Sequence, residues 1–180
     1  RERPSGSTAR WVDPSVQLQA LRKIRWKFAH FAAGNCAVIE LMDLRQQTDY
    51  DCGVVCCQIV WEFFGLPRRR VPASQIDGTD PRTIEAALRQ AGLPVLSGEM
   101  ALSDLSHFAR TSRPVIVLAK STSTPETGHY MVCRGQRDRR LHFQCPTRGP
   151  VVEMPSRFER RWHDVDRLGT RYSRWGIVVG

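Results

Sequence analysis

Residues 46–56 read Gln-Gln-Thr-Asp-Tyr-Asp-Cys-Gly-Val-Val-Cys, a polar turn that passes directly into an apolar segment. Apolar side chains then recur at helical spacing as far as residue 64, and a glycine and a proline follow. The pattern predicts a helix over residues 54–64. Cys52 therefore lies at the point where a turn becomes a helix.

Cys52 is a candidate nucleophile because of this position. The reactive form of cysteine is the thiolate, and the positive end of a helix dipole favours an anion. Gly53 beside it is expected to let a substrate backbone approach closely. A structural cysteine would more naturally lie inside the apolar run, as Cys56 and Cys57 do.

A cysteine nucleophile needs a general base, and the chain has five histidines. His129 opens an apolar strand after a stretch rich in Ser, Thr and Pro, so it can face a helix terminus from a rigid element. His142 lies within a strand and His163 in a basic segment. Gln46, in the turn before Cys52, can donate its amide to an oxyanion next to the Cys52 N–H. Read separately, His129 and Gln46 are more typical of a half-buried strand residue and a polar turn residue.

Helix patterns dominate the first half of the chain and strand patterns the second. Asp80-Pro81 opens a helix that Gly92 closes, and a shorter helix begins at Ser103 or Asp104. This order predicts an α+β fold in which N-terminal helices pack on an antiparallel sheet. The predicted strands cover residues 115–119, 129–133, 141–144, 151–154 and 175–179, and residues 37–42 are expected to form a strand or an extended lead. A turn is predicted over 134–138 around Gly135 and a short helix over 158–162.

The composition is that of an ordinary globular domain with a basic surface. The chain has 180 residues, 41% of them hydrophobic, and a formal net charge of +9. No apolar run is long enough to cross a bilayer, and scattered arginines without a recognised motif argue against specific nucleic-acid binding. The six cysteines are expected to be free thiols because their density is low for a disulfide-stapled domain. Without a C-x-x-C pair, no metal is expected, and no cofactor either.

Residues 1–41 are expected to form an N-terminal extension, and residues 42–180 the folded domain. The extension starts with Arg rather than Met, as a fragment or a processed chain would. Residues 14–33 have helical periodicity with a basic and an apolar face. Such a helix docks on its own domain or binds a membrane or a partner, and docking is the commoner case.

Two segments of the chain resemble a known family. Residues 46–56 fit Gln-x4-Asp-Cys-Gly-x-x-Cys, which is similar to the signature of the bacteriocin-processing cysteine peptidases. Residues 128–132, Gly-His-Tyr-Met-Val, are similar to the histidine-bearing strand of that family, and residues 158–162 to its late Phe…Trp segment. The resemblance covers residues 42–162.

The resemblance implies a papain-like cysteine peptidase fold and a bacterial enzyme that cleaves leader peptides after a double glycine. It implies Cys52 as nucleophile, His129 as general base and acid, and Gln46 as oxyanion donor. The family usually forms the N-terminal domain of ABC exporters. The resemblance therefore implies a peptide or protein substrate and a cytoplasmic location. It implies contact with a membrane only through a larger parent protein.

Cys145 departs from the family pattern. It stands sixteen residues after His129, where the family has an Asp that orients the histidine ring. A thiol is a poor acceptor, and loss of the orienting carboxylate can lower the rate by several orders of magnitude. Four interpretations stay open: Gln144 orients the ring through its amide oxygen, Cys52 and His129 act as a dyad, the domain binds peptides without cleaving them, or Cys145 forms a disulfide with Cys52.

A papain-like fold does not by itself fix the reaction. Deamidases, transglutaminases and acyltransferases use the same Cys–His pair on this fold, so an effector or toxin module is an alternative to a peptidase. Product analysis separates the two, because only proteolysis creates new chain termini.

Overall fold

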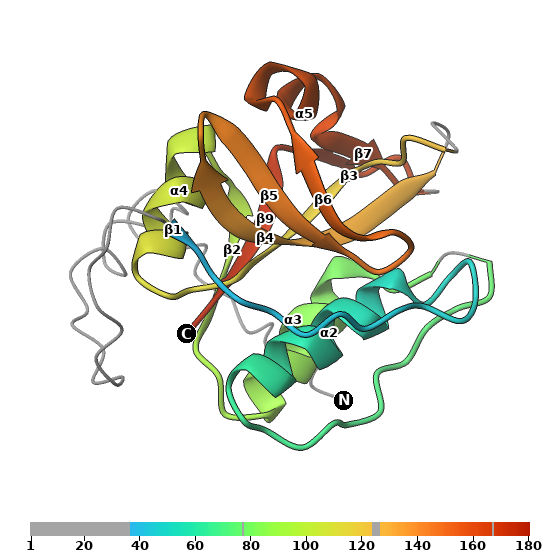
Figure 1. Cartoon of the computed structure of the whole chain (residues 1–180). Coiled ribbons are helices and arrows are strands. Elements are labelled where there is room, and N and C mark those ends of the chain that lie inside the picture. Colours follow the sequence, from blue (N-terminus) through green and yellow to red (C-terminus); the bar gives the residue numbers. More distant parts are fainter. Residues whose placement is uncertain (1–36, 77, 124–126, 167) are drawn as a thin grey trace, which may run out of the picture.

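The computed structural model of the chain describes residues 37–76, 78–123, 127–166 and 168–180 (Figure 1). The helix predicted over residues 14–33 lies outside the described residues. The helices are α2 (Cys52–Phe63), α3 (Pro81–Gln90), α4 (Leu102–Arg110) and α5 (Pro155–Arg161). The strands are β1 (Ala37–Val38), β2 (Val95–Glu99), β3 (Val115–Lys120), β4 (Gly128–Arg137), β5 (Arg140–Cys145), β6 (Gly149–Glu153), β7 (His163–Val165), β8 (Arg171–Ser173) and β9 (Trp175–Val179).

A seven-stranded sheet forms the centre of the fold. Its strand order is β2-β9-β3-β4-β5-β6, and β1 pairs with the far end of β4. Every pair of neighbouring strands is antiparallel. β7 and β8 form a separate two-stranded sheet. The predicted α+β class with an antiparallel sheet is therefore confirmed.

Alternation along the strands gives the sheet two apolar faces. Ile116 and Leu118 of β3 pack in one cluster with α2 and α3, whereas Val115 and Val117 pack in a second cluster with α4 and α5. Figure 1 shows α2 and α3 together on one side of the sheet and α5 on the other. Adjacent residues of a strand thus serve different halves of the core, and this rule decides which side chains of β4 and β5 can meet.

The helices begin where the sequence pattern indicates. The Asp80 carboxylate accepts a hydrogen bond from the Arg82 backbone N–H at 2.7 Å, and Pro81 occupies the first turn of α3. α4 begins at Leu102, close to the predicted start. Among the described residues, no helix has both the length and the apolar character needed to cross a membrane.

One predicted turn is wrong, and three strands were not predicted. β4 continues through Gly135 to Arg137, with an irregular register between Cys133 and Gly135. The chain reverses instead at Asp138 and Arg139, whose φ angles are +52° and +60°. Gly135 marks a bulge inside a strand, because pairing with β1 and β5 continues past it. The unpredicted strands are β2, β7 and β8.

Candidate active site

Cys52 is the first residue of α2, so the helix begins two residues earlier than predicted. The carboxylate of Asp51 does not cap the helix. It accepts hydrogen bonds from the backbone N–H groups of Gln47 and Thr48, at 3.2 and 3.3 Å, and so closes the turn that leads to the helix. The first N–H groups of a helix have no partner within it, which leaves the Cys52 N–H available to a ligand.

Gly53 serves helix packing. A Cβ atom at this position would lie 2.8 Å from the Cβ of Thr79 and 3.0 Å from Ile84. Thr79 directly precedes the cap of α3, so the missing side chain lets the starts of α2 and α3 touch. The space beside Gly53 is filled by α3, and the expected approach of a substrate backbone there has no support in the structure.

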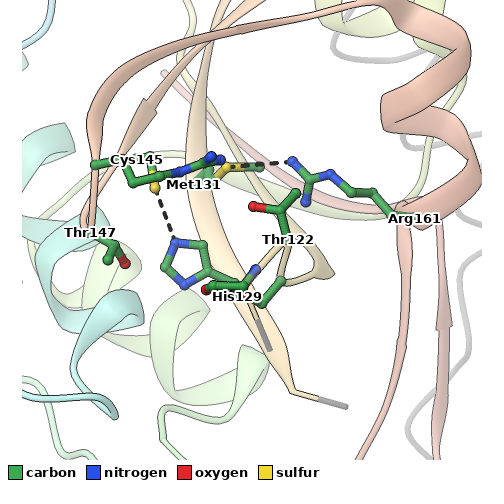
Figure 2. Close-up of a pocket in the computed structure, with 9 residues that line it drawn as sticks. Thr122, His129, Met131, Cys145, Thr147 and Arg161 are labelled. Carbon is green, nitrogen blue, oxygen red and sulfur yellow. Dashed lines mark hydrogen bonds between the residues drawn. The ribbon is translucent and has the colours of Figure 1, made fainter. Parts of the chain in front are cut away.

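His129 and Cys145 meet on one face of the sheet. His129 lies near the start of β4 and Cys145 at the end of the neighbouring strand β5. Like the odd-numbered residues Met131 and Cys133 of β4, both point to the face of the sheet that α5 covers. The Nε2 atom of His129 lies 3.3 Å from the Sγ atom of Cys145. Figure 2 shows the two side chains facing each other, with Thr147 beside them. The thiol of Cys52 is near enough to the same imidazole to raise its pKa.

Gln144 points away from this ring. It pairs with Val132, whose side chain belongs to the face of α2 and α3. The buried Gln144 amide donates from Nε2 to the Asp43 carboxylate at 2.7 Å. Of the two residues considered for orienting His129, the structure brings Cys145 to the ring and Gln144 to Asp43.

Gln46 is held against the turn that follows Cys145. Its backbone N–H donates to the Pro146 carbonyl at 3.0 Å, and its Oε1 atom accepts from the Thr147 hydroxyl at 3.1 Å. Its Nε2 atom donates to the Thr48 carbonyl at 2.8 Å, which leaves the second amide hydrogen for another acceptor. Gln46 thus connects the segment before Cys52 with the segment after Cys145.

Asp43 and Arg45 strengthen the same connection. Asp43 accepts from Gln144 and also from Arg45, at 2.7 Å in both cases. Arg45 in turn donates to the Thr147 carbonyl at 3.2 Å. These groups are about a hundred residues apart in the chain, so nothing in the local sequence indicated the contact. Their effect is to fix the loop before α2 to the end of β5.

The electrostatics of the site couple His129 to two thiols. Burial lowers the pKa of His129, but hydrogen bonds with Cys145 and Cys52 outweigh it and raise the pKa to about 9. Burial raises the pKa of Cys145, but the hydrogen bond and charge of His129, with the backbone N–H groups of Arg148 and Thr147, lower it to about 6. Near neutral pH, this combination corresponds to an imidazolium next to a thiolate.

A small pocket lies on the Cys145 side of the His129 ring (Figure 2). Residues 121–123, from the connection between β3 and β4, form one wall, and residues 147–148 form another. Arg161 lines it from α5 and is held by Glu153 and by the Lys120 carbonyl, the latter at 2.7 Å. The pocket has both polar and apolar lining groups and borders His129 and Cys145.

The described cysteines are free thiols: Cys52, Cys56, Cys57, Cys133 and Cys145. In the part of the chain that the structure covers, no group of three or more His, Cys, Asp and Glu side chains is arranged to hold a metal ion. The site brings together a thiol, an imidazole and hydrogen-bond donors, which are the groups that thiol chemistry needs. Sequence reasoning missed the contributions of Asp43, Arg45 and Thr147, for which the sequence carried no signal.

Comparisons with known proteins give one matching family model. The model of the peptidase C39 family matches residues 43–166. No curated protein gives a significant match.

Solved structures share the fold at low sequence identity. A double glycine motif protease from an AMS/PCAT transporter, in complex with its leader peptide, has a TM-score of 0.61 and 16% identity, over 79% of this chain and 92% of that one. The peptidase domain of Streptococcus ComA, a bi-functional ABC transporter, has a TM-score of 0.57 and 19% identity, over 78% and 96%. The same domain from Streptococcus mutans, with a small-molecule inhibitor, has a TM-score of 0.54 and 17% identity, over 79% and 99%. The predicted papain-like fold is therefore confirmed.

Proposed function

The chain belongs to the peptidase C39 family, a family of cysteine peptidases, and from that premise we propose that Cys52 and His129 cleave a peptide bond by acyl transfer. The observation that carries the proposal is the contact between the Cys52 thiol, at the start of α2, and the His129 imidazole, near the start of β4. A thiol beside an imidazole at a helix terminus is the arrangement that activates sulfur for attack on a carbonyl.

The geometry assigns a separate task to each nitrogen of the His129 ring. Because Nε2 faces Cys145, Nδ1 is the nitrogen left for Cys52, and the imidazolium carries there the proton that the Cys52 thiol has given up. The sulfur attacks the peptide carbonyl, and the imidazolium then gives its proton to the departing amine. In the second half of the reaction, His129 removes a proton from water, which hydrolyses the thioester and frees Cys52.

Two donors support the negative charge that develops on the carbonyl oxygen. One is the backbone N–H of Cys52, which has no acceptor within the helix. The other is the second amide hydrogen of Gln46, whose amide is already oriented by Thr48 and Thr147. Donors that are fixed before the reaction stabilise an oxyanion without reorganising.

The substrate we propose is a peptide or protein that is cut after glycine or another small residue. Support comes from the family and from the structural relatives, one of which is a double glycine motif protease bound to a leader peptide. The net charge of +9 would favour an acidic leader. We place the reaction in the cytoplasm, by analogy with the peptidase domains of ABC transporters.

A peptidyl electrophile ending in Gly-Gly tests the Cys–His pair. Intact-mass analysis should show one adduct on the full chain, and both Cys52→Ala and His129→Ala should abolish it. His142→Ala is the matched control, since this histidine lies on β5 outside the site and should leave labelling unchanged. An unreactive native chain would leave only a peptide-binding role.

Product analysis then separates proteolysis from other acyl transfer. A leader peptide with a Gly-Gly site should yield two fragments with new termini at that site. A changed mass on an intact peptide would indicate side-chain modification instead and would overturn the peptidase proposal.

A further inference from the structure

The sulfur of Cys145 lies between the His129 ring and the turn that follows β5. The Nε2 atom of His129 is 3.3 Å away, and the backbone N–H groups of Thr147 and Arg148 are close enough to lower the pKa of the thiol. The turn after β5 supplies both backbone donors, and Gly149, with φ +81°, lets the chain fold back over the sulfur into β6. The side chain is only 1% exposed, so water cannot replace these donors.

This environment suits an anion. A neutral thiol is a weak acceptor and carries a hydrogen that needs an acceptor of its own, whereas a thiolate accepts several donors. The charge that acts most strongly on Cys145 is the His129 imidazole from β4. Arg45, which is paired with Asp43, and the thiol of Cys56 from α2 also interact with it, and Arg148 and Arg161 line the same pocket.

We propose that Cys145 is a positioning residue that works as a thiolate and holds the His129 ring as a carboxylate would. The inference rests on the proposed function, and it gives the site the same formal charge that an Asp at this position would give. It also replaces the expectation that a thiol here would be a poor acceptor, which holds for the neutral form only.

The other buried cysteines show that burial alone has the opposite effect. Burial raises the pKa of Cys57 and of Cys133 to about 12, and it raises the pKa of Cys56 well above its ordinary value. Cys145 is as little exposed to solvent but lies nearer the surface with fewer atoms packed around it, and its pKa is lowered to about 6. The difference comes from the imidazolium and the two backbone donors.

Thiolate absorbance in the ultraviolet measures this charge without any substrate. Cys52→Ser removes the nucleophile and should leave a thiolate that titrates near pH 6, and the double variant Cys52→Ser/Cys145→Ser should lack it. His129→Ala in the Cys52→Ser chain should move the midpoint upward. A midpoint near the usual value of about 8.5, in a chain with native circular dichroism, would overturn the proposal.

Turnover of a Gly-Gly peptide by variants of Cys145 tests the positioning role. Cys145→Asp should keep activity of the same order, whereas Cys145→Ser and Cys145→Ala should lose about 10⁴-fold, mostly in kcat with KM little changed. Serine has nearly the same size but stays neutral, so a structural role alone would spare it. Equal activity of the Ser variant and the native chain would contradict the thiolate. If the native chain itself neither cleaves nor takes label, the proposed function fails, while the titration still decides the charge of Cys145.

Discussion

Cys52 and Cys145 lie on two sides of one imidazole and differ in what holds them. Cys52 is the first residue of a helix, where the backbone N–H groups point along the helix axis. Cys145 is the last residue of a strand, and the turn to β6 follows it directly. Both side chains are buried, at 7% and 1% exposed, so the difference between them lies in the backbone around each sulfur.

The comparison teaches that the local backbone assigns the role of a cysteine. A sulfur that already has hydrogen-bond donors directed at it is stabilised as an anion. It is less nucleophilic, because these hydrogen bonds must be broken when the sulfur reacts. At a helix start the free N–H groups lie beside the sulfur, and they can serve the substrate instead. In the proposed mechanism, the two cysteines divide the tasks that a nucleophile and an orienting carboxylate perform.

The largest effect should come from exchanging the nucleophile. Cys52→Ala should lower turnover by about a millionfold, the scale seen when a catalytic triad loses its nucleophile. The probe should not move to Cys145, because that sulfur is 1% exposed and hydrogen-bonded. Intact-mass labelling checks both points. Cys57→Ala, one turn further into α2, is the control, and a label on Cys145 in Cys52→Ala would erase the distinction between the two thiols.

Removal of the side-chain oxyanion donor should have the next largest effect. Gln46→Ala should lower kcat by about 10²–10³-fold, because the oxyanion would lose a donor that is already in place. Peptide cleavage kinetics give the value. Gln47→Ala is the matched control, since this exposed neighbour contributes only its backbone to the turn. A loss confined to KM would assign Gln46 to substrate binding instead.

The packing of α2 against the start of α3, next to Cys52, can be changed without removing any of the proposed catalytic side chains. Gly53→Ala should destabilise the fold by about 1–3 kcal/mol, since the added Cβ would lie 2.8 Å from the Cβ of Thr79. Chemical denaturation measures the loss of unfolding free energy, and labelling should slow as the helix start shifts. Gly65→Ala, past the far end of α2, is the comparison: its Cβ would meet nothing within 4 Å, so with a φ of +66° it costs backbone strain alone. Unchanged stability of Gly53→Ala would show that α2 and α3 can separate at no cost.

The pH dependence should show both partners of the Cys145–His129 pair. The pKa of Cys145 is lowered to about 6, so its contribution is lost as the pH falls through 6; the pKa of His129 is raised to about 9, so its contribution is lost as the pH rises through 9. Labelling at Cys52 should therefore follow a bell-shaped profile and decline about tenfold for each pH unit below the acid limb. In Cys145→Asp the acid limb should move to lower pH. An unmoved limb would assign it to another group.

Local patterns predicted the elements that surround the two thiols well. The apolar spacing after Cys52 predicted α2, and the Asp80-Pro81 pair predicted the start of α3, because capping and helix periodicity act over a few residues. Gly135 misled the prediction, since a glycine in a strand and a glycine in a turn are alike in sequence and only the pairing with β1 and β5 distinguishes them. β2 was missed because a short strand with Ser and Gly has no clear period.

Local sequence patterns likewise predicted only part of the candidate site. Cys52 was predicted from its place at a helix start and His129 from its place at a strand start, and both places are local properties of the sequence. The choice between Gln144 and Cys145 could not be made in this way. It depends on which side chains of β5 point to the same face of the sheet as His129 of β4. A shift of one residue in the register would have exchanged Gln144 and Cys145.

By itself the sequence determined the class of fold, Cys52 as the candidate thiol and the strand that carries the His129 imidazole, because periodicity and helix termini depend on residues that are neighbours in the chain. Only the tertiary structure decided that Cys145 faces Nε2 of His129, that backbone donors surround its sulfur, and that Asp43 and Gln46 fix the loop before α2 to the turn after β5. These contacts join residues about a hundred positions apart, and strand register and side-chain direction, which decide them, are set only when the sheet closes on its helices.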